Sequence, residues 1–438
     1  MSESLTIAIT DIVGRWWTDR EANLPQLMPL EKEEEDILRW VDSQVVCGNI
    51  AEYQHCLGSW RPDFLIEMDE NGEEIYRITE INARFVFNGL MHLAYGQESL
   101  HQMLGQNSAF VTATDPEKVD ASLPPPIHFP RSRIHCLLRY QVLQGAFSLF
   151  DPRYPLHLLK DAEAGIDIHM FIRAAEQRLG IKPRLITPAD LRLLPDPHQA
   201  SGYRLCCVVE STAAAGGCWT MVDERSGEVW EEIRQVGVEL HQHELAGLGR
   251  ELLRQVGLRC FNDLRTVLLV HDKRMLGVVR REVPRLQRRG VLTPAQARVL
   301  LAGIAETLLP ASAPLGALLR AQPQRKDEYI LKPIRGGKGQ GIVFGDELSP
   351  AAWATAVQSM AAPGLVLRSA YVVQRRIVPV SYDMVLQDSV GRVRYPLVGT
   401  FHIVNGELLG LGIWRAGSGR IVAISSGGSW MCSVVVRA

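Results

Sequence analysis

A glycine-rich segment between residues 330 and 341 carries the clearest sign of chemistry in this sequence. The segment reads ILKPIRGGKGQG, so an apolar strand is predicted to end at Lys332 and to lead directly into a turn. Glycines let backbone N–H groups converge on an anion, and a lysine neutralises phosphate charge. The lysine precedes the glycines and no Lys-Ser or Lys-Thr pair opens a helix, so this is not a Walker A loop. A plain flexible turn is the alternative interpretation.

A second segment offers oxygen ligands for a metal ion. Residues 79–82 read TEIN, and the two-residue period of a strand places Glu80 and Asn82 on one face, with Ile81 turned to the core. Mg²⁺ takes one or two protein oxygens together with phosphate oxygens and water. The pair therefore suits a magnesium site, although two residues that simply face solvent would show the same spacing.

Two more segments have the pattern of nucleotide contacts. Lys273 follows the apolar run VLLV, which predicts a strand, and it precedes a helix. A lysine at the end of a strand can reach phosphate, whereas a solvated lysine is the commoner case. Residues 371–377 read YVVQRRI and predict a strand whose alternate residues could flank an adenine ring. An ordinary edge or central strand explains that run equally well.

The elements that must position these residues alternate between helix and strand. Residues 31–45 have the periodicity of an amphipathic helix, and Asn71-Gly72 between two β-rich runs indicates a hairpin. Residues 166–186 predict a helix that ends near Gly180 and then a strand, and Thr293 is placed to cap a further helix. We therefore predict an α/β (α+β) fold, and 438 residues are enough for two or three packed lobes.

Composition limits the partners and the location. The formal net charge of -2 gives no global field that would favour nucleic acid or a membrane surface. The opening residues do not have the pattern of a signal peptide, so we do not expect one there, and no apolar run approaches the ~20 residues that span a bilayer. The eight cysteines are scattered without a C-x-x-C pair. These features predict a cytoplasmic protein with no structural zinc, no membrane contact and no nucleic-acid partner.

Six motifs, taken in order, resemble those of the eukaryotic-type glutathione synthetases, which are ATP-grasp ligases with a circularly permuted chain order. They are RPDF (61–64), EIN (80–82), DKRM (272–275), KPIRGGKGQG (332–341), YVVQRRI (371–377) and SGGSW (426–430). The resemblance implies a multi-lobed ATP-grasp fold with a glycine-rich lid, the use of ATP and Mg²⁺, and a homodimer. It divides the chain into a helical segment (1–55), a metal-binding strand region (56–160), a substrate-binding α/β domain (161–262) and the ATP-grasp core with its lid (263–438).

The resemblance also implies which residues contact ATP. Glu80 and Asn82 would coordinate Mg²⁺, and Lys332 and Arg335 would stabilise the charge that develops during catalysis. The remaining ATP contacts would come from a phosphate-binding lysine, the glycines of the lid and the adenine slot. These are Lys273, Gly336, Gly337, Gly339, Val373, Gln374 and Arg376.

Other residues are implied to hold the two substrates. Arg61 and Asp63, which share one motif, would bind substrate. Arg61 would hold a carboxylate of the acyl donor, because a guanidinium matches a carboxylate with two parallel hydrogen bonds. Arg415 would hold the carboxylate of the amine acceptor and assist catalysis. A weaker local similarity places Arg234 at the donor site, and Gly427-Gly428 would belong to a second closing loop.

Three departures from that family concern substrate and metal. Gly336 stands where the family has a glutamate that binds a metal ion, which leaves Asp346 and Asp383 as candidate replacements. The serine-containing turn after the metal strand is replaced by ARFVFN (83–88), which is bulky and cationic. Trp430 stands in a terminal loop that is built of small residues in the family. These changes lie at positions that recognise the substrates in that family, so we do not expect glutathione as the product.

The sequence thus predicts an ATP-dependent ligase that joins a carboxylate to an amine through an acyl phosphate. Its substrates would be small amino acids or peptides, because Arg61 and Arg415 both suit carboxylates. Two alternatives stay open at this point. One is an ATP-grasp kinase that phosphorylates a small molecule, and the other is a nucleotide-binding protein without catalytic activity, as the missing loop glutamate would allow.

Overall fold

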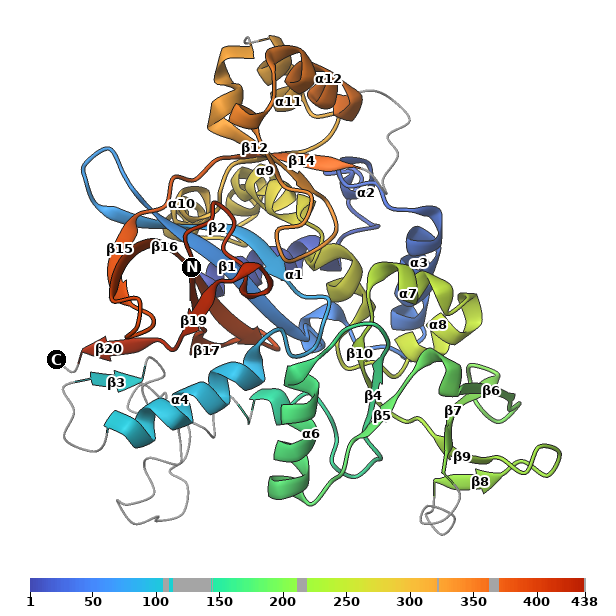
Figure 1. Cartoon of the computed structure of the whole chain (residues 1–438). Helices are drawn as coiled ribbons and strands as arrows, with labels where there is room; N and C mark the ends of the chain where they lie inside the picture. The colour runs from blue at the N-terminus through green and yellow to red at the C-terminus, as the bar shows by residue number, and fades with distance from the viewer. Residues whose placement is uncertain are drawn as a thin grey trace.

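The computed structural model describes residues 1–104, 110–112, 143, 145–210, 219–320, 323–361 and 370–436. Within these residues five sheets and their helices form three layered regions (Figure 1). The predicted mixed α/β fold is confirmed. In the described part of the chain, no helix combines the length and apolar character needed to cross a membrane.

The largest sheet lies at the centre of the molecule and carries the metal-binding motif. It runs in the order β19-β18-β16-β1-β2, with β15 and β17 also paired to β16, and every pairing is antiparallel. The hairpin predicted at Asn71-Gly72 joins β1 to β2, and Gly72 takes the positive φ of +81° that such a turn needs. The strands are β1 (Ser59–Met68), β2 (Glu74–Asn82), β15 (Ser381–Val385), β16 (Arg392–Val404), β17 (Glu407–Leu411), β18 (Trp414–Ala416) and β19 (Ser429–Met431).

A second antiparallel sheet lies above the first in Figure 1 and carries the glycine-rich segment between two of its strands. Its order is β11-β14-β12-β13, and its apolar residues pack with two helices in one cluster that contains Leu331, Trp353 and Val357. The strands predicted around Lys332 and at residues 371–377 are therefore confirmed. The elements are β11 (Thr307–Leu308), β12 (Tyr329–Pro333), β13 (Val343–Phe344), β14 (Tyr371–Arg375), α11 (Ala313–Arg320) and α12 (Pro350–Ala361).

The N-terminal helices share one core with helices from the C-terminal half. Helix α1 packs against α9 and α10, and Leu5 and Ile9 are buried in the same cluster as Val278 and Val283. The predicted helices at residues 31–45 and after Thr293 are confirmed, and the Thr293 hydroxyl accepts a hydrogen bond from the backbone of Gln296. The helices are α1 (Ser2–Gly14), α2 (Leu24–Leu27), α3 (Lys32–Val46), α9 (Arg274–Arg288) and α10 (Pro294–Gly303).

The run before Lys273 is helical, and the prediction of a strand there was wrong. Residues Thr266–Val270 form one turn of π-helix, and the N–H of His271 donates to the carbonyl of Thr266. All five residues are buried, so their apolar character reflects burial on every side. Periodicity cannot separate a short buried helix from a buried strand, which explains the error. Lys273 therefore stands at the start of α9 and not at the end of a strand.

The third region combines a parallel sheet, β10-β4-β5, with an antiparallel sheet, β6-β7-β9-β8. The predicted helix at residue 166 is confirmed, and it ends at Gly180 in the left-handed conformation. Its elements are β4 (His157–Lys160), α6 (Ile166–Leu179), β5 (Arg184–Ile186), β6 (Leu191–Pro195), β7 (Tyr203–Val209), β8 (Thr220–Val222), β9 (Val229–Glu232), β10 (Val236–Glu239), α7 (Gln242–Gly247) and α8 (Arg250–Gly257). Helix α4 (Leu90–Leu104) and the strand pair β3 (Phe110–Thr112) and β20 (Val434–Val436) complete the described fold.

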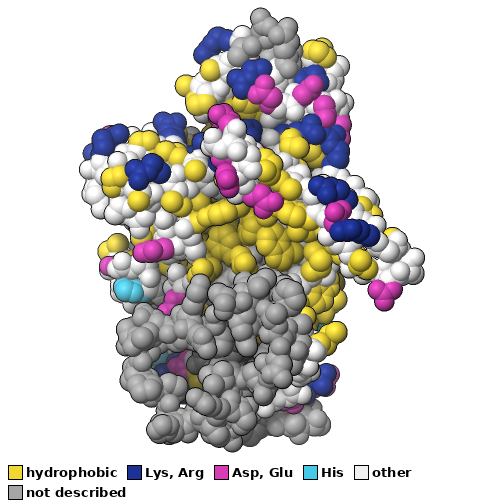
Figure 2. All heavy atoms as spheres, turned by 90° about the vertical axis from the view of Figure 1, so that its left-hand side faces the viewer, with side chains coloured by type: hydrophobic (Ala, Val, Ile, Leu, Met, Phe, Trp, Pro, Cys, Tyr) yellow, Lys and Arg dark blue, Asp and Glu magenta, His cyan; other side chains and the backbone are white. Residues whose placement is uncertain are grey.

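Charge on the face shown in Figure 2 is mixed. Lysine and arginine side chains lie among aspartate and glutamate side chains over the upper part of this face, and apolar side chains gather below them.

The division of the chain into four segments stays a prediction, and the shared core of the first and last segments shows that they pack as one body.

Candidate functional site

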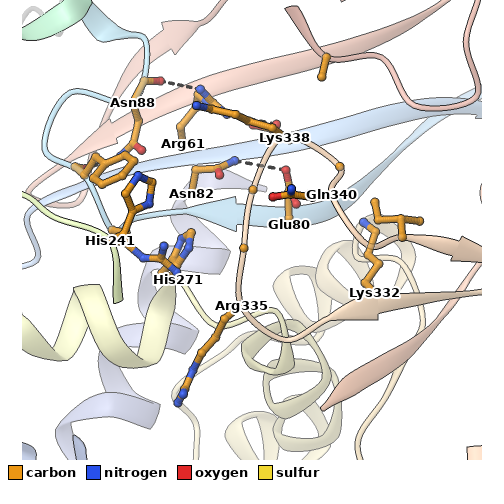
Figure 3. Close-up of a pocket in the computed structure, with 18 of the residues that line it drawn as sticks. Arg61, Glu80, Asn82, Asn88, His241, His271, Lys332, Arg335, Lys338 and Gln340 are labelled. Carbon is orange, nitrogen blue, oxygen red and sulfur yellow. Dashed lines mark hydrogen bonds and ion pairs between the residues drawn. The ribbon is translucent and has the colours of Figure 1, made fainter. Parts of the chain in front are cut away.

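A cavity of about 1420 Å³ lies where the three regions meet. Its walls come from β1 and β2, from the glycine-rich segment after β12, and from residues within 162–167 and 239–246 of the third region. Figure 3 shows side chains from these distant segments facing one another. The size suits a nucleotide with a second small molecule, because ligand sites commonly occupy roughly 300–1,000 Å³.

The end of β2 places a carboxylate among cations. Glu80 and Asn82 line the cavity on one face of the strand, Ile81 is buried behind them, and Asn82 Nδ2 donates to Glu80 Oε1 at 3.5 Å. Lys273 Nζ lies 3.7 Å from Glu80 Oε2. Lys332 Nζ donates to the carbonyl of Thr79 at 3.2 Å. The structure thus brings together two lysines and a Glu-x-Asn strand that lie far apart in the sequence.

The burial of this cluster controls its protonation. Burial by itself would raise the pKa of Glu80, but the charges of Lys273 and Lys332 lower it to about 2, so the carboxylate is ionised at neutral pH. Burial lowers the pKa of Lys332 to about 8, against the attraction of Glu80. A nearby anion would raise the pKa of Lys332 again, because it stabilises the charged ammonium form. The lowered pKa therefore favours the binding of an anion beside this lysine.

The glycine-rich segment crosses the cavity beside this cluster. Lys273 Nζ donates to the carbonyl of Gly336 at 2.7 Å, and the backbone N–H of Lys273 donates to Ile334. Gly336 has a φ of +111°, which a residue with a Cβ atom rarely adopts. A Cβ atom on Gly339 would lie 2.2 Å from Ile421, so a side chain there would clash with the loop that follows β18. Gly336, Gly337 and Gly339 all line the cavity, and their role as a lid over a ligand stays a prediction.

Arg335 is turned away from the cluster around Glu80 (Figure 3). Its guanidinium forms an ion pair with Glu34 on α3 and lies 3.9 Å from Asp272. Glu34 lines the cavity, and burial raises the pKa of its carboxyl against the opposing charge of Arg335. Sequence reasoning missed Glu34, because a run of acidic residues at the start of a helix reads as a solvated face. In the structure Arg335 is therefore held by the protein's own carboxylate.

The strand predicted to hold adenine contributes two of its three predicted residues to the cavity. The side chain of Gln374 is buried, and its amide donates to the Thr79 carbonyl at 3.1 Å and to the Thr307 hydroxyl at 2.9 Å. Arg376 lines the cavity and pairs with Asp346 at 2.7 Å. Val373 is fully buried in the apolar cluster behind the sheet and does not line the cavity. Strand side chains alternate, so the side chain of Val373 points to the opposite face from Gln374, and only its backbone could lie along an adenine ring, which stays a prediction.

The two predicted carboxylate-binding arginines share one internal carboxylate. Arg61 Nε donates to Asp63 Oδ1 at 2.9 Å, Arg61 Nη1 donates to the Asn88 carbonyl at 2.8 Å, and Arg415 pairs with the other oxygen of Asp63. Asp63 is buried, and it lines the cavity together with both arginines. Arg415 Nε has no hydrogen-bond partner among the described residues. The two arginines thus lie side by side, with donor capacity left on Arg415.

Arg234 and the second glycine pair lie outside the cavity wall. Arg234 forms an ion pair with Glu232 at 2.9 Å and lies over the rings of Tyr154 and Trp219. It belongs to the link between β9 and β10, so the prediction that it binds substrate is not supported by its position. Gly427 and Gly428 follow residues 423–425, which do line the cavity, but they are not part of its wall.

The turn at residues 83–88, which departs most from the glutathione synthetases, is held in place by hydrogen bonds to buried polar groups. The carboxylate of Glu239 accepts from the N–H groups of Val86 at 2.7 Å and Phe87 at 3.2 Å, and burial raises the pKa of Glu239 to about 8 against these hydrogen bonds. Asn262 Nδ2 donates to the Arg84 carbonyl at 3.1 Å, and Phe85 lines the cavity. Sequence reasoning missed Glu239 and Asn262, because neither follows a recognisable motif.

Arg84 is the unusual member of this turn. It is buried in the cavity wall, and its Nε and Nη2 atoms have no hydrogen-bond partner among the described residues. Burial, together with the charge of Arg335, lowers the pKa of Arg84 to about 10. A buried guanidinium without a full set of partners is costly, so this position favours an anionic ligand.

Neither candidate for the missing metal ligand faces Glu80. Asp346 pairs with Arg376 and Arg420, and Asp383 is exposed on β15 between Arg392 and Arg394. The cavity wall includes neither aspartate. Glu80 and Asn82 are therefore the protein groups of this cluster that offer oxygen atoms to Mg²⁺.

Comparisons with known proteins give a family model, a curated relative and a similar structure. A family model described as the AnkG N-terminal domain matches residues 1–269. The chain is 33% identical over 439 residues to the ATP-grasp enzyme AnkG of Aspergillus thermomutatus, covering 99% of this chain and 84% of that protein. A glutathione synthetase-like effector from Globodera pallida in its apo form aligns with a TM-score of 0.46 and 10% identity, over 98% of this chain and 84% of that one.

Proposed function

Because this chain belongs to the AnkG family of ATP-grasp enzymes, we propose that it is an ATP-dependent ligase that joins a carboxylate to an amine. The observation that supports this most is the gathering of Lys273, Lys332 and Glu80. Glu80 and Lys332 line a cavity that is large enough for ATP and a second substrate, and Lys273 contacts Glu80 from behind that wall. The ligase class is favoured over the other ATP-grasp chemistries by Arg61 and Arg415, which lie together in the same cavity.

The phosphate end of ATP belongs beside the two lysines. Lys332, which is buried, and Lys273, which also holds the glycine-rich segment, would neutralise the charge that develops on the transferred phosphoryl group. Glu80 and Asn82 fit Mg²⁺, because the first is ionised and the second offers an amide oxygen on the same face of β2. When bound, Mg²⁺ would add positive charge at the phosphate oxygens.

The proposed reaction has two steps and needs no side-chain nucleophile. An oxygen of the donor carboxylate attacks the γ-phosphorus of ATP, the bond to the bridging oxygen of ADP breaks, and an acyl phosphate forms. The amine of the acceptor then attacks the acyl carbon, the bond from that carbon to the phosphate oxygen breaks, and phosphate leaves. The protein's part is to position the reactants and to exclude water, and we assign the second task to the glycine-rich segment acting as a lid.

We propose amino acids or small peptides as substrates, each with a carboxylate that an arginine can hold. Arg61 and Arg415 are already bridged by Asp63, so a substrate carboxylate would add to this bridge at the donor capacity left on Arg415. Arg84 and Phe85 give the neighbouring wall a cationic and aromatic character. That wall differs from the small serine-containing turn of glutathione synthetases, and we propose a product other than glutathione.

The identity of the products tests this proposal. The protein is incubated with ATP, Mg²⁺ and an amino-acid library, and the mixture is analysed by mass spectrometry. A ligase gives ADP, free phosphate and a new amide. A stable phosphorylated product with no amide would identify a small-molecule kinase instead. ATP binding without substrate-stimulated ADP formation would identify a non-catalytic protein.

A further inference from the structure

A histidine–aspartate pair stands in the cavity wall and has no part in the chemistry described above. His92 lies in the first turn of α4 and Asp167 in the first turn of α6, and both line the cavity. His92 Nδ1 lies 2.5 Å from Asp167 Oδ1. The same carboxylate accepts from the backbone N–H of His92 at 3.1 Å and from the N–H of Gly89. Three hydrogen-bond contacts therefore hold the carboxylate of Asp167, and one of them is to the ring of His92.

This arrangement leaves the outer nitrogen of the ring available to a ligand. With Nδ1 bonded to the carboxylate, the tautomer that carries its proton on Nδ1 is favoured, and Nε2 becomes the proton acceptor. The side chain of His92 is 30% exposed, whereas that of Asp167 is 14% exposed. The hydrogen bond to Asp167 raises the pKa of His92, although burial opposes this, so the ring is a stronger base than a free histidine.

The position of the pair matches the two carboxylate-binding arginines. Gly89 follows Asn88, whose carbonyl accepts from Arg61, and a Cβ atom on Gly89 would lie 3.5 Å from Arg61 Nη1. On the other side, the ring of His92 contacts that of Trp430, with 6.2 Å between centroids, and Trp430 lies directly opposite Arg415 across β18 and β19. His92 therefore neighbours the sites proposed for both substrates.

We propose that His92, oriented by Asp167, is the base that takes a proton from the acceptor amine as it attacks the acyl phosphate. This inference rests on the proposed ligase function and adds a residue to it. An amine attacks only through its free electron pair, and most amines are protonated at neutral pH. His92 Nε2 takes one proton from the ammonium group, the freed electron pair forms the C–N bond as the bond from carbon to the phosphate oxygen breaks, and the leaving phosphate takes the second proton from nitrogen. The imidazolium then returns its proton to solvent. General bases of this kind contribute about 10²- to 10⁴-fold to rate.

A structural role is the competing explanation, because Asp167 also satisfies the N–H groups at the start of α4. The choice of nucleophile separates the two roles. Hydroxylamine is largely unprotonated at neutral pH and traps acyl phosphates as hydroxamates without needing a base. A loss that comes from misplaced structure affects both nucleophiles, whereas the loss of a base affects only the amine that must be deprotonated.

The experiment compares wild type with His92→Gln, which can still donate to Asp167 but cannot accept the proton. The matched control is His169→Gln, because His169 is exposed on α6 and lies outside the cavity wall. Each protein receives ATP, Mg²⁺ and the amino acids that give product with wild type, with and without saturating hydroxylamine. We expect amide formation by His92→Gln to fall about 10²-fold or more. Hydroxamate formation should stay within about twofold of wild type, and the melting temperature should be unchanged. The control should match wild type in every measurement.

Each other outcome has a defined meaning. Unchanged amide formation, or an equal loss of amide and hydroxamate in a folded His92→Gln protein, overturns the assignment of His92 as the base. Hydroxamate and ADP from wild type without any amide would retain the acyl phosphate and remove the amine step, and with it the base. A wild-type protein that forms neither product overturns the ligase function itself.

Discussion

Two groups of buried arginines in this molecule differ in how completely they are paired. At the contact between the N-terminal helices and α9, Arg15 donates to Asp11, Asp19 and Glu282, with 2.6 Å between Arg15 Nη2 and Glu282. Nearby, Arg274 is fully buried and uses all three nitrogens, two toward Asp272 and one toward a backbone carbonyl. In the cavity wall, Arg84 is buried to a similar degree as Arg15 and leaves two nitrogens without a partner among the described residues.

We infer from this difference that Arg15 and Arg274 stabilise the fold, whereas Arg84 is placed to bind an anionic ligand. Burial acts against the charged form in both places, yet the carboxylates around Arg15 raise its pKa overall, whereas the pKa of Arg84 is lowered to about 10. A fully paired arginine stabilises the fold only as long as its partners remain. An arginine in a cavity that lacks partners lowers the free energy of unfolding of the ligand-free protein. An anion that binds to it raises the free energy of unfolding again.

The largest effect on stability is expected from a substitution in the ion-pair network around Arg15. Glu282 is buried and lies within ion-pair distance of both Arg15 and Arg285. Glu282→Gln should lower the free energy of unfolding by about 1.5–3 kcal/mol, because it removes one of the three carboxylates that pair with the buried Arg15. Urea denaturation measures the change, and the Kd for ATP should stay within about twofold. A stability loss below about 1 kcal/mol would mean that this network contributes little.

The largest effect on activity is expected at Lys332. Lys332→Met should reduce ADP formation by about 10²- to 10³-fold, the size typical of removing one group that stabilises transition-state charge. The fold should be retained, because the buried ammonium is replaced by an apolar chain of similar length. Initial rates and a melting curve check this. Turnover equal to wild type would remove the assignment of this lysine to the phosphates.

A substitution at Arg84 should affect binding and stability in opposite directions. Arg84→Met should leave the stability of the ligand-free protein unchanged or slightly higher, because an underpaired buried charge is removed. The affinity for the anionic substrate should fall about tenfold, the order expected for one charge-assisted hydrogen bond. Thermal shift with and without substrate compares the two effects. A loss of more than about 2 kcal/mol in the free protein would show that Arg84 is structurally paired after all.

Local pattern predicted the elements of this fold better than it predicted their burial. The hairpin at Asn71-Gly72, the strand ending at Lys332 and the helix capped by Thr293 follow from short-range signals, and all three are present. The run Thr266–Val270 was misassigned, because an apolar segment that is buried on all sides has no face to reveal its period.

The same limit applies to the candidate site. The motifs around Glu80 and Lys332 were found because their spacing carries chemistry. The partners Glu34 and Glu239, and the pairing of His92 with Asp167, depend on contacts between segments tens to hundreds of residues apart, which spacing cannot show. The side chain of Val373 is buried behind its strand, so any adenine contact there would come from the backbone. Arg234 was placed by a weak similarity that its position between β9 and β10 does not support.

The central claim is that the phosphates of ATP lie against Lys332, and proton uptake on binding tests it most directly. The pKa of Lys332 is lowered to about 8 in the free protein, so close to half of the molecules carry a neutral lysine at pH 8. An adjacent phosphate raises that pKa, and protons must be taken up. Calorimetry of ATP binding at pH 8, in buffers with different ionisation enthalpies, should show an uptake of about half a proton by wild type that is absent from Lys332→Arg, because arginine stays charged. Binding without proton uptake by wild type, or with equal uptake by both proteins, would contradict the account.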